Sequence, residues 1–206
     1  MIGEGRRLGM AVLFLDISGF SGRPSETTDE QSLLLKVLNL FFTEMVRIAE
    51  DYGGTVEKNT GDGLMAYFED GGGDPPESGC KRAVAASLTM MAANESLIRP
   101  ILDATPVPDI KFRVSIDYGW VTIARLGAAR RFNANVAIGA TANFACKMLG
   151  FASPGDIVIG AEVRGRLPTG WHQYTELMPV TTGWVYRQSG LAYTLYKYTG
   201  RWIGAR

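Results

Sequence analysis

The sequence has few cysteines and histidines, and it lacks a long apolar run. Its 206 residues include two cysteines and one histidine, His172. Two cysteines cannot form a dense disulfide framework, and a lone histidine cannot build a His-rich zinc site. The apolar run that begins at Met10 ends at Asp16, far short of the roughly 20 residues that a membrane span requires. With no signal peptide recognisable either, we expect a cytoplasmic protein without a membrane span.

Net charge is also absent. The 21 Lys and Arg residues balance 21 Asp and Glu residues, and the isoelectric point is about 6.6. This balance removes the general electrostatic attraction expected of a nucleic-acid binder or a polybasic membrane anchor. The length suits one domain with a substantial core and leaves no room for a second, regulatory domain.

Hydrophobic periodicity and turn residues predict an α+β domain. We expect helices on one side of a largely antiparallel sheet, with both cysteines on buried helix faces and Thr141 as a helix cap. The expected strands are residues 10–15, 55–58, 64–68, 112–119, 157–159 and 193–196; the expected helices are 28–50, 80–97 and 139–148; and residues 128–135 are expected to be a polar connection.

Two aspartates stand where chemistry is expected. Asp16 closes the first buried strand, and Asp62 lies at the tip of a predicted hairpin, each beside glycines that permit a ligand to approach the backbone. Hard divalent ions are normally held by one or two carboxylates together with substrate phosphates. The pair therefore points to two Mg²⁺ or Mn²⁺ ions and a nucleoside triphosphate. The alternative is that Asp62 is only a favourable turn residue.

Four segments in order carry a resemblance to a known family. They are Phe14-Leu15-Asp16-Ile17-Ser18-Gly19-Phe20, Glu57-Lys58-Asn59-Thr60-Gly61-Asp62-Gly63, Phe112-Arg113-Val114-Ser115-Ile116-Asp117-Tyr118-Gly119, and Ile138 to Met148 with Asn143 and Lys147. In order and spacing they resemble the catalytic domain of class III nucleotidyl cyclases, the adenylate and guanylate cyclases. The resemblance covers residues 10–198, with 1–9 as an N-terminal extension and 199–206 as a tail.

The resemblance implies a ferredoxin-like fold and a head-to-tail homodimer with two composite active sites. Asp16, Asp62 and the backbone carbonyl of Ile17 would hold both metal ions, and the amides of Ser18, Gly19 and Phe20 would cradle the phosphates. The ribose 3′-hydroxyl would attack the α-phosphorus, and pyrophosphate would leave.

The helix near residue 143 carries the remaining matches. Asn143 matches the asparagine that orients the ribose, and Lys147 stands where the family has an arginine that stabilises the transition state. Lysine keeps the charge but lacks the planar fork, so either the geometry of the site is altered or another cation helps. Arg187 lies in the loop where the family often has a phosphate-binding lysine, and Arg125, Arg130 and Arg131 are also available.

The base-selecting pair departs from the purine cyclases. Lys58 matches the lysine of adenylate cyclases, but Val136 stands where their aspartate would be. Adenine and cytosine present an exocyclic amine that requires an acceptor, and valine supplies none. Because each buried unpaired polar group costs about 1–3 kcal/mol, this inventory favours UTP, which leaves the fewest groups unpaired.

A second resemblance agrees with this preference. Short class III domains with an altered base pair resemble the bacterial pyrimidine cyclases of anti-phage signalling, whose cyclic UMP or cyclic CMP activates a separately encoded effector. We therefore expect a uridylate cyclase. The alternatives are a cytidylate cyclase, a purine cyclase, and a degenerate cyclase-like module that dimerises or senses nucleotides without catalysis.

Overall fold

The computed structural model describes residues 5–22, 27–59, 61–71, 77–105, 107–129, 132–186 and 189–202. The side chains of Ser21, Lys58, Asn59 and of residues 125–129 and 132–137 lie outside the description. The strands are β1 (Gly5–Ile17), β2 (Thr55–Asn59), β3 (Gly63–Glu69), β4 (Phe112–Ala129), β5 (Phe132–Ile138), β6 (Ile157–Gly160), β7 (Thr175–Leu177) and β8 (Leu195–Tyr198). The helices are η1 (Phe20–Gly22), α1 (Thr28–Asp51), α2 (Gly79–Ala93), η2 (Asn94–Ile98), α3 (Arg99–Leu102), α4 (Ala140–Met148), η3 (Leu149–Phe151), α5 (Ala161–Gly165) and η4 (Thr169–Tyr174).

β1 and β4 form the centre of one sheet. Its strand order is β2-β3-β1-β4-β6-β8-β7, and β5 folds back on β4 as an additional antiparallel partner. Among the described strands, only β4 and β6 pair in parallel. The sheet is therefore largely antiparallel, as the sequence predicted.

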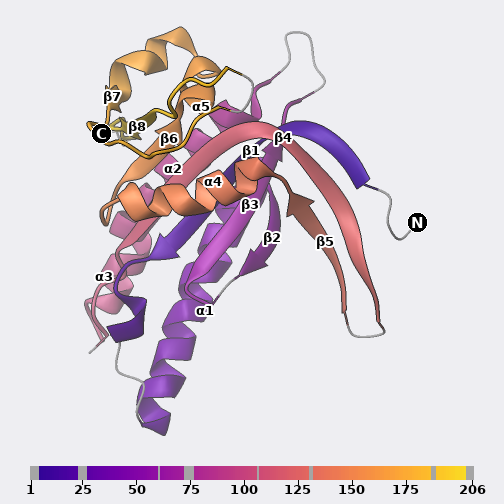
Figure 1. Ribbon diagram of the computed structural model, residues 1–206. Coiled ribbons are helices and arrows are strands. Elements are labelled where there is room, and N and C mark those ends of the chain that lie inside the picture. Colours follow the sequence, from indigo (N-terminus) through magenta and orange to yellow (C-terminus); the bar gives the residue numbers. More distant parts are fainter. Residues whose placement is uncertain are drawn as a thin grey trace.

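Helices cover both faces of the sheet, so the expected one-sided arrangement is wrong (Figure 1). Alternate residues of β1 point to opposite faces because a strand has a side-chain period of two. Leu13 packs in one core cluster with Phe41 of α1 and Val84 of α2, whereas Val12 packs in another with Ala145 of α4. A strand buried on both faces explains why residues 10–15 are continuously apolar.

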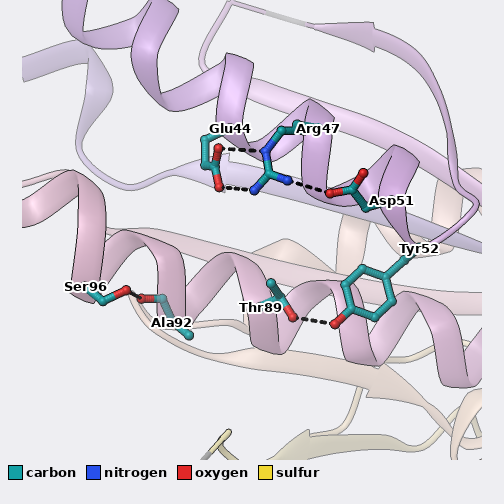
Figure 2. Close-up of polar contacts among 7 residues, drawn as sticks. All are labelled: Glu44, Arg47, Asp51, Tyr52, Thr89, Ala92 and Ser96. Carbon is teal, nitrogen blue, oxygen red and sulfur yellow. Dashed lines mark hydrogen bonds and ion pairs between the residues drawn. The ribbon is translucent and has the colours of Figure 1, made fainter. Parts of the chain in front are cut away.

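Polar contacts fix the ends of α1 and join it to α2. Thr27 caps α1 and forms a reciprocal capping box with Glu30. Tyr52, just after α1, hydrogen-bonds through its hydroxyl to Thr89 Oγ1 of α2 at 2.8 Å. On the exposed side of α1, Arg47 bonds to Glu44 one turn earlier and to Asp51 one turn later. Figure 2 shows these contacts of Arg47 and the bond between Tyr52 and Thr89.

Several local expectations differ from the structure. Within the predicted polar connection at residues 128–135, residues 128–129 instead end β4 and residues 132–135 begin β5. The two strands together project from the sheet (Figure 1). Cys80 is buried as expected, but Cys146 is exposed. Gly139, not Thr141, is the N-cap residue of α4, and Thr141 is buried against the sheet. Within the described ranges, no helix is both long and apolar enough to cross a membrane.

Candidate functional site

Strand register brings the two candidate metal-binding aspartates together. Asp16 in β1 pairs with Gly63, the first residue of β3, so Asp62 lies in the turn just before that strand and diagonally across from Asp16. Neighbouring strands in a sheet are about 4.8 Å apart. The Ile17 amide donates a hydrogen bond of 2.8 Å to the Asp62 carbonyl and holds the two segments in place. The left-handed backbone of Gly61, with φ of +94°, makes the sharp turn that precedes Asp62. Both carboxylates therefore lie at the same end of the sheet.

Arg113 neutralises Asp16 from the other side. It lies directly opposite Asp16 in the pairing of β1 with β4, and its Nε and Nη2 atoms lie 2.9 and 2.8 Å from Asp16 Oδ2. Its third nitrogen donates a bond of 3.3 Å to the Ala152 carbonyl, which holds the guanidinium across the strand ends. Both side chains are partly buried, so this ion pair is less screened than a surface pair.

The segment after Asp16 turns away from the sheet beside the carboxylates. The Ser18 amide donates a bond of 2.8 Å to the Lys111 carbonyl, and Gly19 has a positive φ of 69° before the short helix η1. Because the Ser18 amide is engaged in this bond, a phosphate at this turn would depend on the Gly19 and Phe20 amides. The Ser18 hydroxyl oxygen is buried and has no hydrogen-bond partner among the described residues.

These donors suit hard divalent ions. Asp16 and Asp62 offer carboxylate oxygens at adjoining strand ends, and oxygen ligands are what Mg²⁺ and Mn²⁺ prefer. Within the described part of the chain, no three His, Cys, Asp or Glu side chains gather as a complete metal site. The residues therefore fit ions that take their remaining ligands from a bound triphosphate and water.

Asn143 and Lys147 lie on the exposed side of α4. They are one helical turn apart, whereas Ala142, Ala145 and Met148 are buried against the sheet or its neighbouring core. The Ser115 hydroxyl of β4 donates a buried bond of 2.6 Å to the Ala145 carbonyl and anchors the middle of the helix. This placement directs Asn143 and Lys147 away from the sheet whose strand ends carry the two aspartates.

The two positions that we predict to select the base lie on strands that approach each other. Lys58 is in β2 next to an irregularity in its pairing with β3, and Val136 is in β5 opposite Ala124 of β4. β2 and β5 come into contact although they are not hydrogen-bonded neighbours. The side chains of Lys58, Val136 and Arg125 lie outside the description, as do residues 130, 131 and 187 altogether. The predicted roles of these residues therefore stay predictions.

Sequence reasoning missed Arg113 as a member of the site. The residue lies inside one of the quoted motifs, next to Phe112, but only the pairing of β1 with β4 places it beside Asp16. The available signal was a cation at the start of a strand that must neighbour the strand ending in Asp16. Because residues so far apart in sequence are joined only by strand register, composition and spacing did not reveal the pair.

Comparisons with known proteins agree with this arrangement. The family profile described as "Adenylate and Guanylate cyclase catalytic domain" matches residues 6–182. An adenylate cyclase of Anabaena cylindrica is 30% identical over 144 residues, which cover 68% of this chain and 27% of that protein. The chain thus spans about a quarter of that relative's length.

Two solved structures extend the comparison over nearly the whole chain. The adenylyl cyclase CyaB from P. aeruginosa is 25% identical with a TM-score of 0.74, and the alignment covers 98% of this chain and 97% of that one. The guanylyl cyclase Cya2 is 20% identical with a TM-score of 0.77, covering 97% and 96% of the two chains. At 20% identity, the likeness to Cya2 supports the fold alone.

Proposed function

Because the chain belongs to the family of adenylate and guanylate cyclase catalytic domains, we propose that it converts a nucleoside triphosphate into a 3′,5′-cyclic nucleotide and pyrophosphate. The observation that carries the proposal is that Asp16 and Asp62 lie at the same end of the sheet, with Arg113 paired to Asp16. Two carboxylates and a fixed guanidinium are the groups that a metal-bound triphosphate requires.

In the proposed reaction the ribose 3′-oxygen forms a bond to the α-phosphorus as the bond to the departing pyrophosphate oxygen breaks. Asp16, Asp62 and the Ile17 carbonyl would hold two Mg²⁺ or Mn²⁺ ions, which lower the pKa of the attacking hydroxyl and neutralise the triphosphate. The hydroxyl proton passes to a solvent water as the new bond forms. The chain's own residues position the groups: Gly19 and Phe20 amides bind phosphate oxygens, Asn143 orients the ribose, and Lys147 stabilises the charge that develops on the α-phosphate.

We further propose that the active unit is a homodimer. Asn143 and Lys147 are exposed on the side of α4 that faces away from the sheet, whereas Asp16 and Asp62 end strands within it. A second copy, placed head to tail, would bring its α4 to the aspartates of the first and create two equivalent sites. This arrangement makes each active site dependent on both chains.

For the base, we propose UTP. Val136 offers no hydrogen-bond acceptor at the position opposite Lys58, and uracil leaves the fewest polar groups unpaired in such a pocket. A uridylate cyclase would act in the cytoplasm and supply cyclic UMP to a separate effector in anti-phage signalling. A second candidate, an adenylate cyclase, is favoured by the name of the Anabaena relative. CTP is the alternative if an acceptor comes from elsewhere in the pocket.

The test is a panel of the four ribonucleoside triphosphates with Mn²⁺, with the products identified by mass spectrometry. Faster cyclisation of UTP than of the other three supports the proposal. Faster cyclisation of ATP or GTP than of either pyrimidine overturns the pyrimidine preference and leaves a purine cyclase. A Val136→Asp variant provides the matched check, since a new acceptor should raise ATP turnover relative to UTP.

An Asp62→Ala variant separates catalysis from a non-catalytic module. The aspartate ends a hairpin turn at the surface of the sheet, so its truncation should leave the dimer folded. Loss of turnover with retained folding supports the metal role. Full turnover in this variant overturns the mechanism, and absence of any cyclic product from the natural chain favours a module that binds nucleotides without catalysis.

A further inference from the structure

A buried aspartate and tyrosine lie beneath the helix that carries Asn143 and Lys147. Asp117 in the middle of β4 is 1% exposed, and its Oδ1 atom accepts a hydrogen bond from the hydroxyl of Tyr193, which is 4% exposed. Along β4, Ser115 and Gly119 on either side of Asp117 both contact α4. The metal, ribose and base roles described above use neither Asp117 nor Tyr193.

The pair is tightly enclosed. A Cβ atom at Gly160 of β6 would lie 2.5 Å from Asp117 Oδ1, so the carboxylate needs glycine at that position. Burial raises the pKa of Asp117 to about 7. The Tyr193 hydroxyl and the Tyr118 amide oppose the shift by donating to the carboxylate, and Glu162 on α5 adds to it through like charge. The carboxyl is thus held by specific partners instead of by solvent.

Aromatic contacts connect the pair to α4. The Tyr193 ring lies 5.0 Å from the ring of Phe144 in α4, and Trp184 lies 5.2 Å from the same Phe144 ring. Met148, one turn further along α4, belongs to the same core cluster as Tyr193. To the core cluster that contains Val12 of β1, α4 contributes only the small residues Ala142 and Ala145. The large side chains that fix the rotation of α4 therefore pack on Tyr193 and its aromatic neighbours.

The α4 residues that pack on the Tyr193 cluster are sequence neighbours of the two candidate catalytic residues. Phe144 immediately follows Asn143, and Met148 immediately follows Lys147. Each candidate catalytic side chain therefore leaves the helix next to a side chain anchored in the Tyr193 cluster. A small rotation or shift of α4 at that cluster would move both Asn143 and Lys147, and misplacement by about 1 Å can cost a hundredfold in rate.

We propose that the hydrogen bond between Asp117 and Tyr193 positions α4 for catalysis, so that both are positioning residues of the cyclase reaction. The inference rests on the proposed function, because the reaction is where the position of Asn143 and Lys147 matters. Asp117 and Tyr193 do not touch the nucleotide in this arrangement. Tyr193 acts through its contact with Phe144, and Asp117 acts by holding the Tyr193 hydroxyl.

The test compares two tyrosines that each donate to an aspartate. Tyr193→Phe keeps the ring contacts with Phe144 and removes only the hydroxyl. The control is Tyr118→Phe, because Tyr118 donates to Asp70 Oδ2 at 2.6 Å in a partly exposed pair on the opposite side of the sheet from α4. We expect Tyr193→Phe to lower kcat about tenfold, the equivalent of one lost hydrogen bond, with KM changed less than about twofold. Tyr118→Phe should keep the natural kcat.

A second comparison addresses Asp117 itself. Asp117→Asn retains an oxygen that can accept from Tyr193, whereas Asp117→Leu retains none. We expect Asp117→Asn to keep most of the turnover and Asp117→Leu to lose at least as much as Tyr193→Phe. All assays are made well below the melting temperature of each variant, so that the fraction unfolded does not contribute.

Two results would overturn the proposal. One is natural kcat in Tyr193→Phe together with a lowered melting temperature, which assigns the pair to stability alone. The other is an equal loss of kcat in Tyr118→Phe. If the natural chain cyclises no nucleotide, the proposed function fails separately, and amide hydrogen exchange then tests whether the pair positions α4. Faster exchange of α4 amides in Tyr193→Phe than in Tyr118→Phe supports the positioning role, and equal protection in the two variants refutes it.

Discussion

Arg113 lies directly opposite Asp16 in the central strand pair, with its Nε and Nη2 atoms 2.9 and 2.8 Å from one carboxylate oxygen. The Arg113 guanidinium thus forms an ion pair with the carboxylate that we propose as a metal ligand. A bound divalent ion would compete with the guanidinium, and the triphosphate would offer Arg113 an alternative partner. Binding of metal and of nucleotide should therefore be coupled through this one side chain.

Removal of the guanidinium should separate metal binding from turnover. In Arg113→Ala, Mn²⁺ should bind more tightly in the absence of nucleotide, because Asp16 no longer has a competing cation, while turnover falls at least about tenfold. Mn²⁺ titration monitored by electron paramagnetic resonance and a cyclase assay measure the two effects. Arg47→Ala is the control, since it removes two exposed ion pairs on α1. Weaker Mn²⁺ binding in Arg113→Ala would contradict the competition.

Two inactive variants should restore activity when mixed. Asp62→Asn damages the metal side of both composite sites, and Asn143→Ala damages the ribose side. A heterodimer of the two contains one intact site, and free exchange of equal amounts gives half of all dimers as heterodimers, so about a quarter of the natural activity should return. A mixture of Asp62→Asn with Asp62→Ala is the control. No recovery despite demonstrated subunit exchange would contradict a site shared between chains.

The two cysteines should react at very different rates with thiol reagents. Burial raises the pKa of the Cys80 thiol to about 12, whereas Cys146 is exposed on α4 between Asn143 and Lys147. We expect one thiol to be modified promptly in the folded protein and the second only after unfolding. Modification of Cys146 should inhibit turnover, and Cys146→Ser should be resistant to that inhibition. Inhibition that persists in Cys146→Ser would place the sensitive group elsewhere.

Asp117 should make stability depend on pH near neutrality. Burial raises the pKa of this carboxyl to about 7 in the folded protein, well above its ordinary value of 3.8. The folded state then binds the proton more tightly than the unfolded state, so the stabilisation is complete below about pH 4 and is lost as the pH rises to about 7. Asp117→Asn has no ionisable carboxyl, so its melting temperature should rise relative to that of the natural chain between pH 5 and 8.

The control for this measurement is Asp103→Asn, which changes an exposed carboxyl just after α3. Its melting temperature should follow that of the natural chain across the same pH range. A gap between Asp117→Asn and the natural chain that stays constant with pH would show that Asp117 does not titrate there.

Much of the fold follows from local patterns. The apolar run before Asp16 predicts a strand buried on both faces, and the helical spacing of apolar residues predicts α1, α2 and α4, because each of these signals is contained in one short segment. The errors arose where distant segments decide. In the expected polar connection, residues 128–129 and 132–135 are strand because β4 and β5 pair with each other. Cys146 is exposed because α4 rests on the sheet through Ala142 and Ala145.

The sequence by itself determined which residues carry the expected chemistry and, through its ordered motifs, the family. Asp16, Asp62, Asn143 and Lys147 could be named because each lies in a short segment with a recognisable pattern. Only the tertiary structure decided what surrounds them. Arg113 meets Asp16 through strand register, and Asp117 is buried against Tyr193 although they are 76 residues apart. Side chains distant in sequence are brought together by strand pairing and packing, which no single segment encodes.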